Sequence, residues 1–463
     1  MFMIRERLQS PEQKAHTIES IVAETPEVAG VQAYEYFRND NVKQRDRFIA
    51  ADHGNPHLAY PLLTRENLAR LSMRADEAMI SLLPGEQNDK TKALFDALEY
   101  RHAEIFMLNM AADMHNPALS STERTEATEW FVTANEALYG LPDVAVFSAA
   151  MQRDVLGLLR AASENMEHSF LQHELRDLLG EVAASNEGLH VPSELTVQRL
   201  RGLVLDRFTP LVDYIDIAKT YTAVEMRDAF QESLARLEGD ALGWRAALVP
   251  SSSALAVSAH QKIIEIGENK KDLDGLTLQG KVVHEAGVHA GRSITAAKAG
   301  WLSAAYGQEG YLDFEESLAT IFEDLYTGAD SVGASSNYYI ACGLALGLDN
   351  HAPRDFRGVY EIMWRKKALE KITATQPELS KETLEKAKRA AYSACVRIFR
   401  GTPCDVPGMI YTKDLAYFRG QELAWEALDD VETQEDIDLL LTGKLDLTRP
   451  EHARIAHDIA LAY

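Results

Sequence analysis

Two histidines, His284 and His289, constrain this chain of 463 residues more than any other feature of its sequence. Glu285 follows the first histidine directly, so the segment reads His-Glu-x-x-x-His. Two imidazoles and a carboxylate suit Zn²⁺, and a glutamate beside such a metal can act as a base. On a regular α-helix, however, residues with this spacing project about 140° apart. A shared metal therefore requires a bulged turn between the histidines, and Gly287 inside the motif would ease that distortion.

The histidine spacing alone is weak evidence for a metal site. It recurs in two other pairs, His168/His173 and His452/His457. Neither has a glutamate after its first histidine, and both lie in charged, helix-like surroundings, so we expect partly exposed surface histidines there. The motif at His284 differs because its flanks are apolar and a second acidic pair, Glu315 and Glu316, follows on a segment with helical periodicity. The alternative for His284 is a hydrogen-bonded histidine–glutamate pair that holds no metal.

Helical patterns dominate the chain on both sides of the motif. From Thr64 to about residue 207, apolar residues recur at a helical period between breaks at proline or glycine. Three short apolar runs, at 244–249, 254–258 and 262–266, predict strands just before the motif. We therefore predict an α+β fold that is predominantly α-helical, with a small antiparallel sheet next to the zinc-binding helix.

The predicted domain organisation is one compact body of two lobes. Residues 1–50 form an N-terminal extension, residues 51–240 a helical lobe, and residues 241–463 a metallopeptidase lobe that holds the zinc site. No internal repeat or low-complexity linker separates them.

Charge and cysteine content narrow the class of partner and the compartment. The formal net charge of −24 argues against nucleic acid and against an anionic membrane surface as partners. The three cysteines do not make a disulfide framework, which favours a reducing compartment. Charged residues come too early for a secretory signal, and apolar runs are too short for a membrane span. We expect a cytoplasmic protein, and the sequence carries no signal for its oligomeric state.

Several motifs of the chain resemble those of one known family. Residues 284–292 resemble the His-Glu-x-Gly-x-His-x-x-Arg signature of the DUF1704 or QEGLA-motif family, which includes the eukaryotic microtubule-associated tyrosine carboxypeptidases. Residues 315–319 resemble its Gln/Glu-Glu-Gly-Leu-Ala motif, with Ser317 in place of glycine. Other family elements are matched in order by residues 55–61, 139–143, 397–402 and 411–420. The resemblance covers roughly residues 50 to 430.

The resemblance implies the zinc ligands and the catalytic base, and the chemistry of other residues in the matched motifs adds further candidates. Zn²⁺ would be held by His284, His289 and Glu316, with Glu285 as the catalytic base. Tyr417 would hydrogen-bond the substrate or the oxyanion. Four basic residues of the matched motifs are candidates for binding the substrate carboxylate, namely Arg292, Arg397, Arg400 and Lys413.

The predicted function is a zinc-dependent metallopeptidase, most simply a carboxypeptidase that acts on a peptide or protein C-terminus. Each imidazole needs an acceptor for its other nitrogen, and Glu323 lies on the helical face of Glu316 for that role. One alternative is a dipeptidyl aminopeptidase resembling dipeptidyl peptidase III, which would need an acidic pocket for the substrate amine. Another is a non-catalytic helical binding protein whose structural zinc is closed by a fourth protein ligand.

Overall fold

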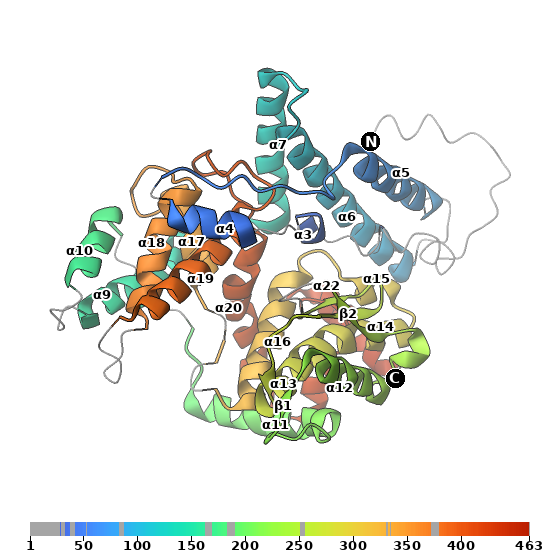
Figure 1. Cartoon of the computed structure of the whole chain (residues 1–463). Coiled ribbons are helices and arrows are strands. Elements are labelled where there is room, and N and C mark those ends of the chain that lie inside the picture. Colours follow the sequence, from blue (N-terminus) through green and yellow to red (C-terminus); the bar gives the residue numbers. More distant parts are fainter. Residues whose placement is uncertain are drawn as a thin grey trace.

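The computed structural model of the chain is predominantly helical, with two small sheets, which confirms the predicted fold class at that level (Figure 1). The structure describes residues 28, 33–37, 42–51, 53–82, 88–162, 169–182, 190–250, 255–329, 332–333, 335–371 and 379–462. In these described residues no helix combines the length and apolarity needed to cross a lipid bilayer.

The helices and strands follow one another in this order along the chain. The first half contains α3 (Ala33–Tyr36), α4 (Val42–Ala50), α5 (Arg65–Leu82), α6 (Asp89–Met114), α7 (Ser121–Tyr139), α8 (Val144–Met151), η2 (Gln152–Leu156), α9 (Gly157–Ala162), α10 (Ser169–Leu178), α11 (Glu194–Val212), β1 (Thr220–Tyr221) and α12 (Ala223–Arg236). The second half contains η4 (Asp240–Leu242), β2 (Arg245–Val249), β3 (Leu255–Ser258), β4 (Ile263–Gly267), β5 (Leu273–Asp274), α13 (Gly275–Val282), η5 (Val283–Ala290), α14 (Gly291–Lys298), α15 (Leu302–Tyr306), α16 (Tyr311–Thr327), α17 (Asn337–Leu346), α18 (Phe356–Leu369), α19 (Lys381–Phe399), η6 (Lys413–Leu415), α20 (Ala416–Asp429), α21 (Gln434–Leu440) and α22 (Pro450–Leu461).

The sheet before the histidine motif is mixed, so the prediction of an antiparallel sheet is wrong in part. Its strand order is β2-β4-β3, with β4 parallel to β2 and antiparallel to β3. Every residue of β4 is buried, whereas β2 and β3 are partly exposed. The most buried strand thus takes the centre, where both neighbours cover it. Strands β1 and β5 form a separate antiparallel pair.

The two largest of three hydrophobic cores among the described residues organise the molecule, and each combines segments that are far apart in the sequence. The first core combines residues from 28–175 with residues from 339–418. The second core combines residues from 200–326 with residues from 424–441, and it contains the apolar positions around the histidine motif. In Figure 1, α17, α18 and α19 accordingly lie beside α4, α9 and α10, which come from the first half of the chain. The chain therefore crosses between the two cores more than once.

Helix α20 joins the two cores and packs closely against α16. Phe418 near its start belongs to the first core, and Trp425 belongs to the second. A methyl group on Gly420 would lie 1.8 Å from the backbone oxygen of Asp313 in α16, so glycine permits the close approach. Ser317 stays compatible with that approach because its hydroxyl donates to the backbone oxygen of Tyr417 at 3.1 Å.

The other histidine pairs are only partly as expected. His173 and His457 are exposed, whereas His168 lies outside the described residues. His452 is buried, and its Nδ1 accepts a hydrogen bond from the backbone N–H of Asp446 at 3.0 Å. The expectation of exposure is therefore wrong for His452, whose ring has a backbone partner that its local sequence does not indicate.

Candidate metal and peptide-binding site

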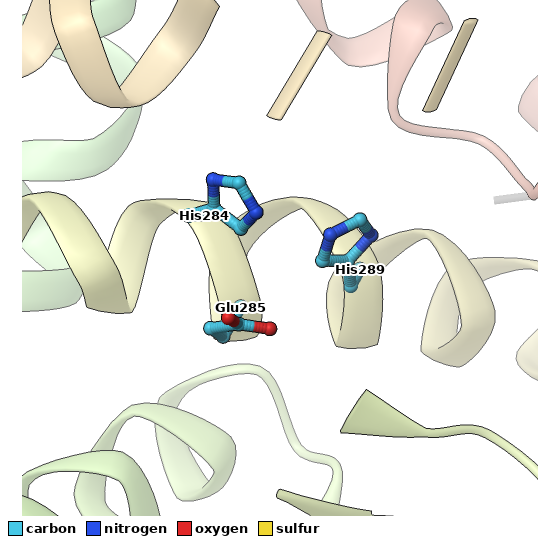
Figure 2. Close-up of side chains that lie close together, drawn as sticks. All are labelled: His284, Glu285 and His289. Atoms are coloured by element: carbon cyan, nitrogen blue, oxygen red, sulfur yellow. The ribbon is translucent and has the colours of Figure 1, made fainter. Parts of the chain in front are cut away.

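The histidine motif lies on a π-helical turn, η5, between α13 and α14. This confirms the bulge that the spacing of His284 and His289 requires, because a π-turn places one more residue in each turn than an α-helix. Figure 2 shows both imidazoles on the same side of this turn. Their ring centroids lie 4.9 Å apart, and ligand atoms of His284, Glu285 and His289 all lie within 4.8 Å of one another.

Gly287 serves the turn through a close approach, not through the conformational freedom we expected. It is absent from the described residues with positive φ. A methyl group at this position would lie 2.6 Å from Cε1 of Phe208, which packs onto η5 from α11. Glycine is needed because the buried aromatic ring occupies the space of a side chain.

Replacing Gly287 with alanine is expected to destabilise the protein by about 1 to 3 kcal/mol, because the new methyl group would collide with Phe208. Gly202 on α11 is a matched control, since a methyl group there meets nothing within 4 Å. The alanine at residue 202 should stabilise its helix by about 0.5 to 1 kcal/mol. Urea unfolding of both variants measures the two effects. Equal stability of the two variants would contradict the packing role of Gly287.

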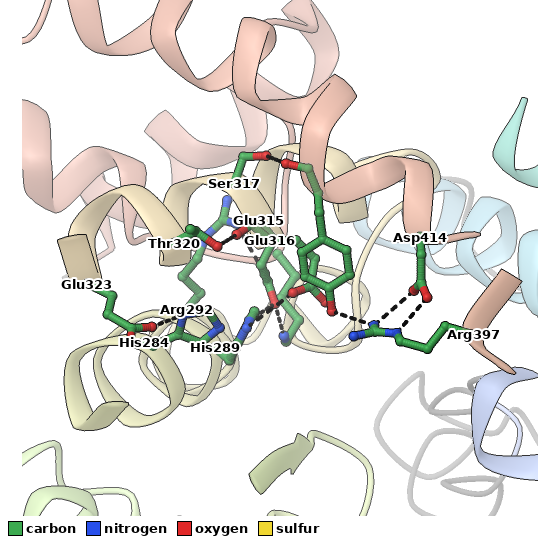
Figure 3. A network of polar contacts seen from close by, with 12 residues as sticks. His284, His289, Arg292, Glu315, Glu316, Ser317, Thr320, Glu323, Arg397 and Asp414 are labelled. Carbon is green, nitrogen blue, oxygen red and sulfur yellow. Dashed lines mark hydrogen bonds and ion pairs between the residues drawn. The ribbon is translucent and has the colours of Figure 1, made fainter. Parts of the chain in front are cut away.

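Each imidazole is held through its Nδ1 by a carboxylate of α16. Nδ1 of His284 lies 2.9 Å from Oε2 of Glu323, and Nδ1 of His289 lies 2.8 Å from Oε1 of Glu315 (Figure 3). Glu323 therefore takes the supporting position that its spacing predicts, while Glu315 takes one that the sequence did not indicate. This pattern fixes the rings and leaves both Nε2 atoms for a metal, as is usual for metal-binding histidines.

The carboxylate of Glu315 is in turn held by two buried cations. Arg292 donates to its Oε2 at 3.1 Å and to the backbone oxygen of Leu445 at 2.6 Å, and Lys444 donates to its Oε1. Burial opposes the charge of Glu315, but Lys444, His289 and Arg292 outweigh it and lower its pKa to about 2. Arg292 is fully buried and lies outside the cavity, so the structure places it behind Glu315 and away from a substrate.

Two further carboxylates lie beside the imidazoles. Burial raises the pKa of Glu285, and the neighbouring His284 and His289 only partly offset that rise. Glu316 approaches from α16, with Oε2 at 3.8 Å from Nε2 of His289. His284, Glu285 and His289 thus form one group of possible ligands, and Glu316 lies beside it next to His289.

A cavity of about 240 Å³ opens over these side chains and lies between the two cores. One wall carries His284, Glu285, His289 and Glu316, with edge strand β3 beside them. The opposite wall is cationic, and four of its residues are Arg397, Arg400, Lys413 and Tyr417. One cavity therefore brings together the predicted metal-binding residues and the predicted substrate-binding residues, apart from Arg292.

The cationic wall is organised around Asp414 on the 3₁₀ turn η6. Arg397 binds it with two hydrogen bonds, at 2.7 and 3.0 Å, and Arg400 adds a third at 2.9 Å. Burial would raise the pKa of Asp414, but these two arginines and Lys413 hold it well below its usual range. Burial lowers the pKa of Lys413 itself. Three cations against one carboxylate leave this wall positive.

Replacing Asp414 with asparagine is expected to cost about 3 kcal/mol of stability, because two arginines would lose a buried ionic partner. Asp438 offers a matched control, since its ion pair with Arg207 is exposed. The same substitution at residue 438 should cost less than about 1 kcal/mol. Denaturant unfolding compares the two variants, and a similar small cost for both would show that Asp414 does not organise the wall.

A comparison with known protein families finds a match, and it covers the residues of the cationic wall. The sequence model of the family described as microtubule-associated tyrosine carboxypeptidase matches residues 378–456. That segment carries the cationic wall and Lys444, whereas His284, His289 and Glu316 precede it. No curated protein matches the chain. Residues 378–456 thus relate the chain to the microtubule-associated tyrosine carboxypeptidase family and favour a carboxypeptidase-like activity.

Proposed function

We propose that the protein is a zinc-dependent carboxypeptidase that removes the C-terminal residue of a peptide or protein. The observation that carries this proposal is the π-helical turn η5, which directs His284 and His289 into one cavity opposite a cationic wall. A peptide C-terminus needs such a wall for its carboxylate. The family match over the cationic wall supports the same reaction class.

The donor set fits Zn²⁺. Both histidines line one cavity, and a carboxylate lies next to each Nδ1, which leaves Nε2 of each ring for a metal, as is usual for metal-binding imidazoles. We assign Glu316 as the third ligand because it approaches His289 from a separate helix. Glu285 follows His284 directly and remains for proton transfer. Bound here, zinc would polarise the scissile carbonyl and make water more acidic.

The protein's own residues would handle the protons and the substrate. Glu285 takes a proton from the attacking water and passes it to the leaving amine, for which its raised pKa is suited. The cationic wall holds the substrate carboxylate. Edge strand β3, which lines the cavity through Leu255, Ala256 and Val257, offers a backbone along which the preceding residues extend.

The cationic wall of the cavity argues against the aminopeptidase alternative. A free substrate amine would face Arg397, Arg400 and Lys413 on the wall opposite the histidines. Like charges facing each other across a binding site disfavour binding. The cationic wall also argues against a non-catalytic protein with a structural zinc. A structural zinc site is closed by protein ligands and does not need a cationic cavity beside it.

Peptides blocked at either end test the proposal. The family description names tyrosine, so the first substrate is a peptide that ends in tyrosine. The zinc-loaded protein should shorten this peptide and its N-acetylated form by their last residue, as product masses will show. It should leave the C-terminal amide intact. Cleavage that N-acetylation abolishes would instead establish an aminopeptidase, and no cleavage of any form would reject peptidase activity on this substrate.

A further inference from the structure

Arg397 lines the cavity, but its guanidinium is already engaged by the protein. Its Nε and Nη2 donate to Asp414, its Nη2 also donates to the hydroxyl oxygen of Tyr417 at 3.2 Å, and its Nη1 donates to that of Tyr338 at 3.1 Å. An arginine has five N–H donors, and these contacts use four of them. The guanidinium also stacks on both tyrosine rings, at 4.6 Å from Tyr338 and 5.1 Å from Tyr417. It has little capacity left for a substrate carboxylate.

Arg400 is different because most of its donors have no partner among the described residues. Its Nε donates to the backbone oxygen of Arg397, and one Nη2 hydrogen donates to Asp414. Both hydrogens of Nη1 remain, and the side chain lines the cavity beside Lys413. An arginine binds a carboxylate most strongly through parallel N–H bonds from two different nitrogens, and Arg400 keeps hydrogens for this on both Nη1 and Nη2.

The contact between Arg397 and Tyr417 also sets the direction of a proton. The Tyr417 oxygen accepts from Arg397, so its own hydrogen must point away from the guanidinium. Within the described residues this hydroxyl has no acceptor, and Tyr417 lines the same cavity as Glu285 and His289. A hydroxyl held this way is preorganised to donate to the oxygen that gains charge when a peptide bond is attacked.

We propose that the two arginines divide two tasks. Arg397 is a positioning residue that directs the hydroxyl proton of Tyr417 into the cavity, and Arg400 binds the substrate carboxylate. This inference rests on the proposed carboxypeptidase function. It revises the simpler expectation in which both arginines bind the carboxylate together.

Steady-state kinetics on the tyrosine-ending peptide separate the two tasks. Arg397→Met should lower kcat between about ten- and a hundredfold with KM changed by less than about twofold, and Tyr417→Phe should act in the same way. Arg397→Lys should not restore kcat, because an ammonium lacks the planar fork that holds Asp414 and Tyr417 together. When Tyr417→Phe is already present, adding Arg397→Met should lower kcat by less than about threefold. The two substitutions remove the same interaction, so their effects should not multiply.

Arg400→Met is the matched comparison and should act on binding. It should raise KM by about 30-fold, which is the loss expected for a hydrogen-bonded charge pair. Its effect should multiply with that of Tyr417→Phe, because the two residues would act on different parts of the substrate.

Peptide binding can also be measured without hydrolysis. A general structural defect would weaken binding of the carboxylate and of the amide alike, whereas loss of a carboxylate contact would weaken only the first. In the Glu285→Gln background, calorimetry compares the peptide that ends in a free tyrosine carboxylate with its C-terminal amide. Arg397→Met should keep the preference for the carboxylate, and Arg400→Met should lose it. Loss of the preference with Arg397→Met, or full multiplication of its effect with Tyr417→Phe, would overturn the division of tasks. If the parent protein neither binds nor cleaves the peptide, the proposed function itself fails.

Discussion

Replacing Glu285 with glutamine is expected to lower peptide hydrolysis by about a thousandfold or more, while zinc content and fold are preserved. Glutamine has the size of glutamate but cannot take a proton from water. Glu285 is buried within the cavity and is the carboxylate directly next to His284, and burial raises its pKa. The measurement is the initial rate on the tyrosine-ending peptide, with zinc determined by mass spectrometry of the same sample.

Glu426 on α20 provides a control for the loss of one negative charge, because it is exposed and lies outside the cavity. The same substitution there should leave the rate unchanged. A Glu285→Gln protein that retains zinc and at least a tenth of the parental rate would remove Glu285 from its role as base. A variant that loses zinc would instead make Glu285 a ligand.

Replacing His289 with alanine is expected to weaken zinc binding by more than about a hundredfold and to abolish hydrolysis. Removing a residue that only supports a metal ligand already weakens metal binding by about 10- to 100-fold. His289 would be a ligand itself, so its loss should weaken zinc binding further. Its Nδ1 is engaged by Glu315, so its Nε2 is the atom directed toward Glu316 and the cavity. Competition with a chromophoric chelator measures the affinity.

His173 is the control for this substitution, since it belongs to a pair with the same spacing but is exposed. Its alanine variant should bind zinc as the parent does. Zinc retained at full stoichiometry and unchanged affinity in the His289→Ala protein would show that the metal lies elsewhere.

The π-helical turn η5 could be predicted from the sequence because helix geometry allows few ways to bring His284 and His289 to one metal. Two histidines with this spacing can share a metal only if the helix is bulged, and η5 is such a turn. Glu323 could be placed in the same way, since it lies two helical turns beyond Glu316 on one face of α16. Both predictions depend on neighbours within one helix, where spacing determines direction.

Contacts between distant segments were not predictable in this way. Lys444 reaches Glu315 from 129 positions along the chain, and no local pattern indicates that pair. Arg292 follows the metal motif closely, yet burial directs it to Glu315 and not to the cavity. The sheet order likewise depends on which strand the rest of the molecule covers, and this makes β4 central.

Glu315 and Glu316 show how adjacent residues acquire different tasks. Successive positions on a helix project about 100° apart, so the two carboxylates approach His289 from different sides. In α16, Glu315 holds Nδ1 of His289 from behind, and Glu316 faces its Nε2. The acidic pair was visible in the sequence, but the division between ligand and support follows from how α16 packs on η5.

Anomalous diffraction at the zinc absorption edge, from a crystal of the zinc-loaded protein, tests the central claim most directly. We expect one peak inside the cavity at about 2 Å from Nε2 of His284, Nε2 of His289 and an oxygen of Glu316. Glu285 should lie outside this bonding distance. A peak bound by Glu285 in place of Glu316, a peak at another group of residues, or no peak would contradict it.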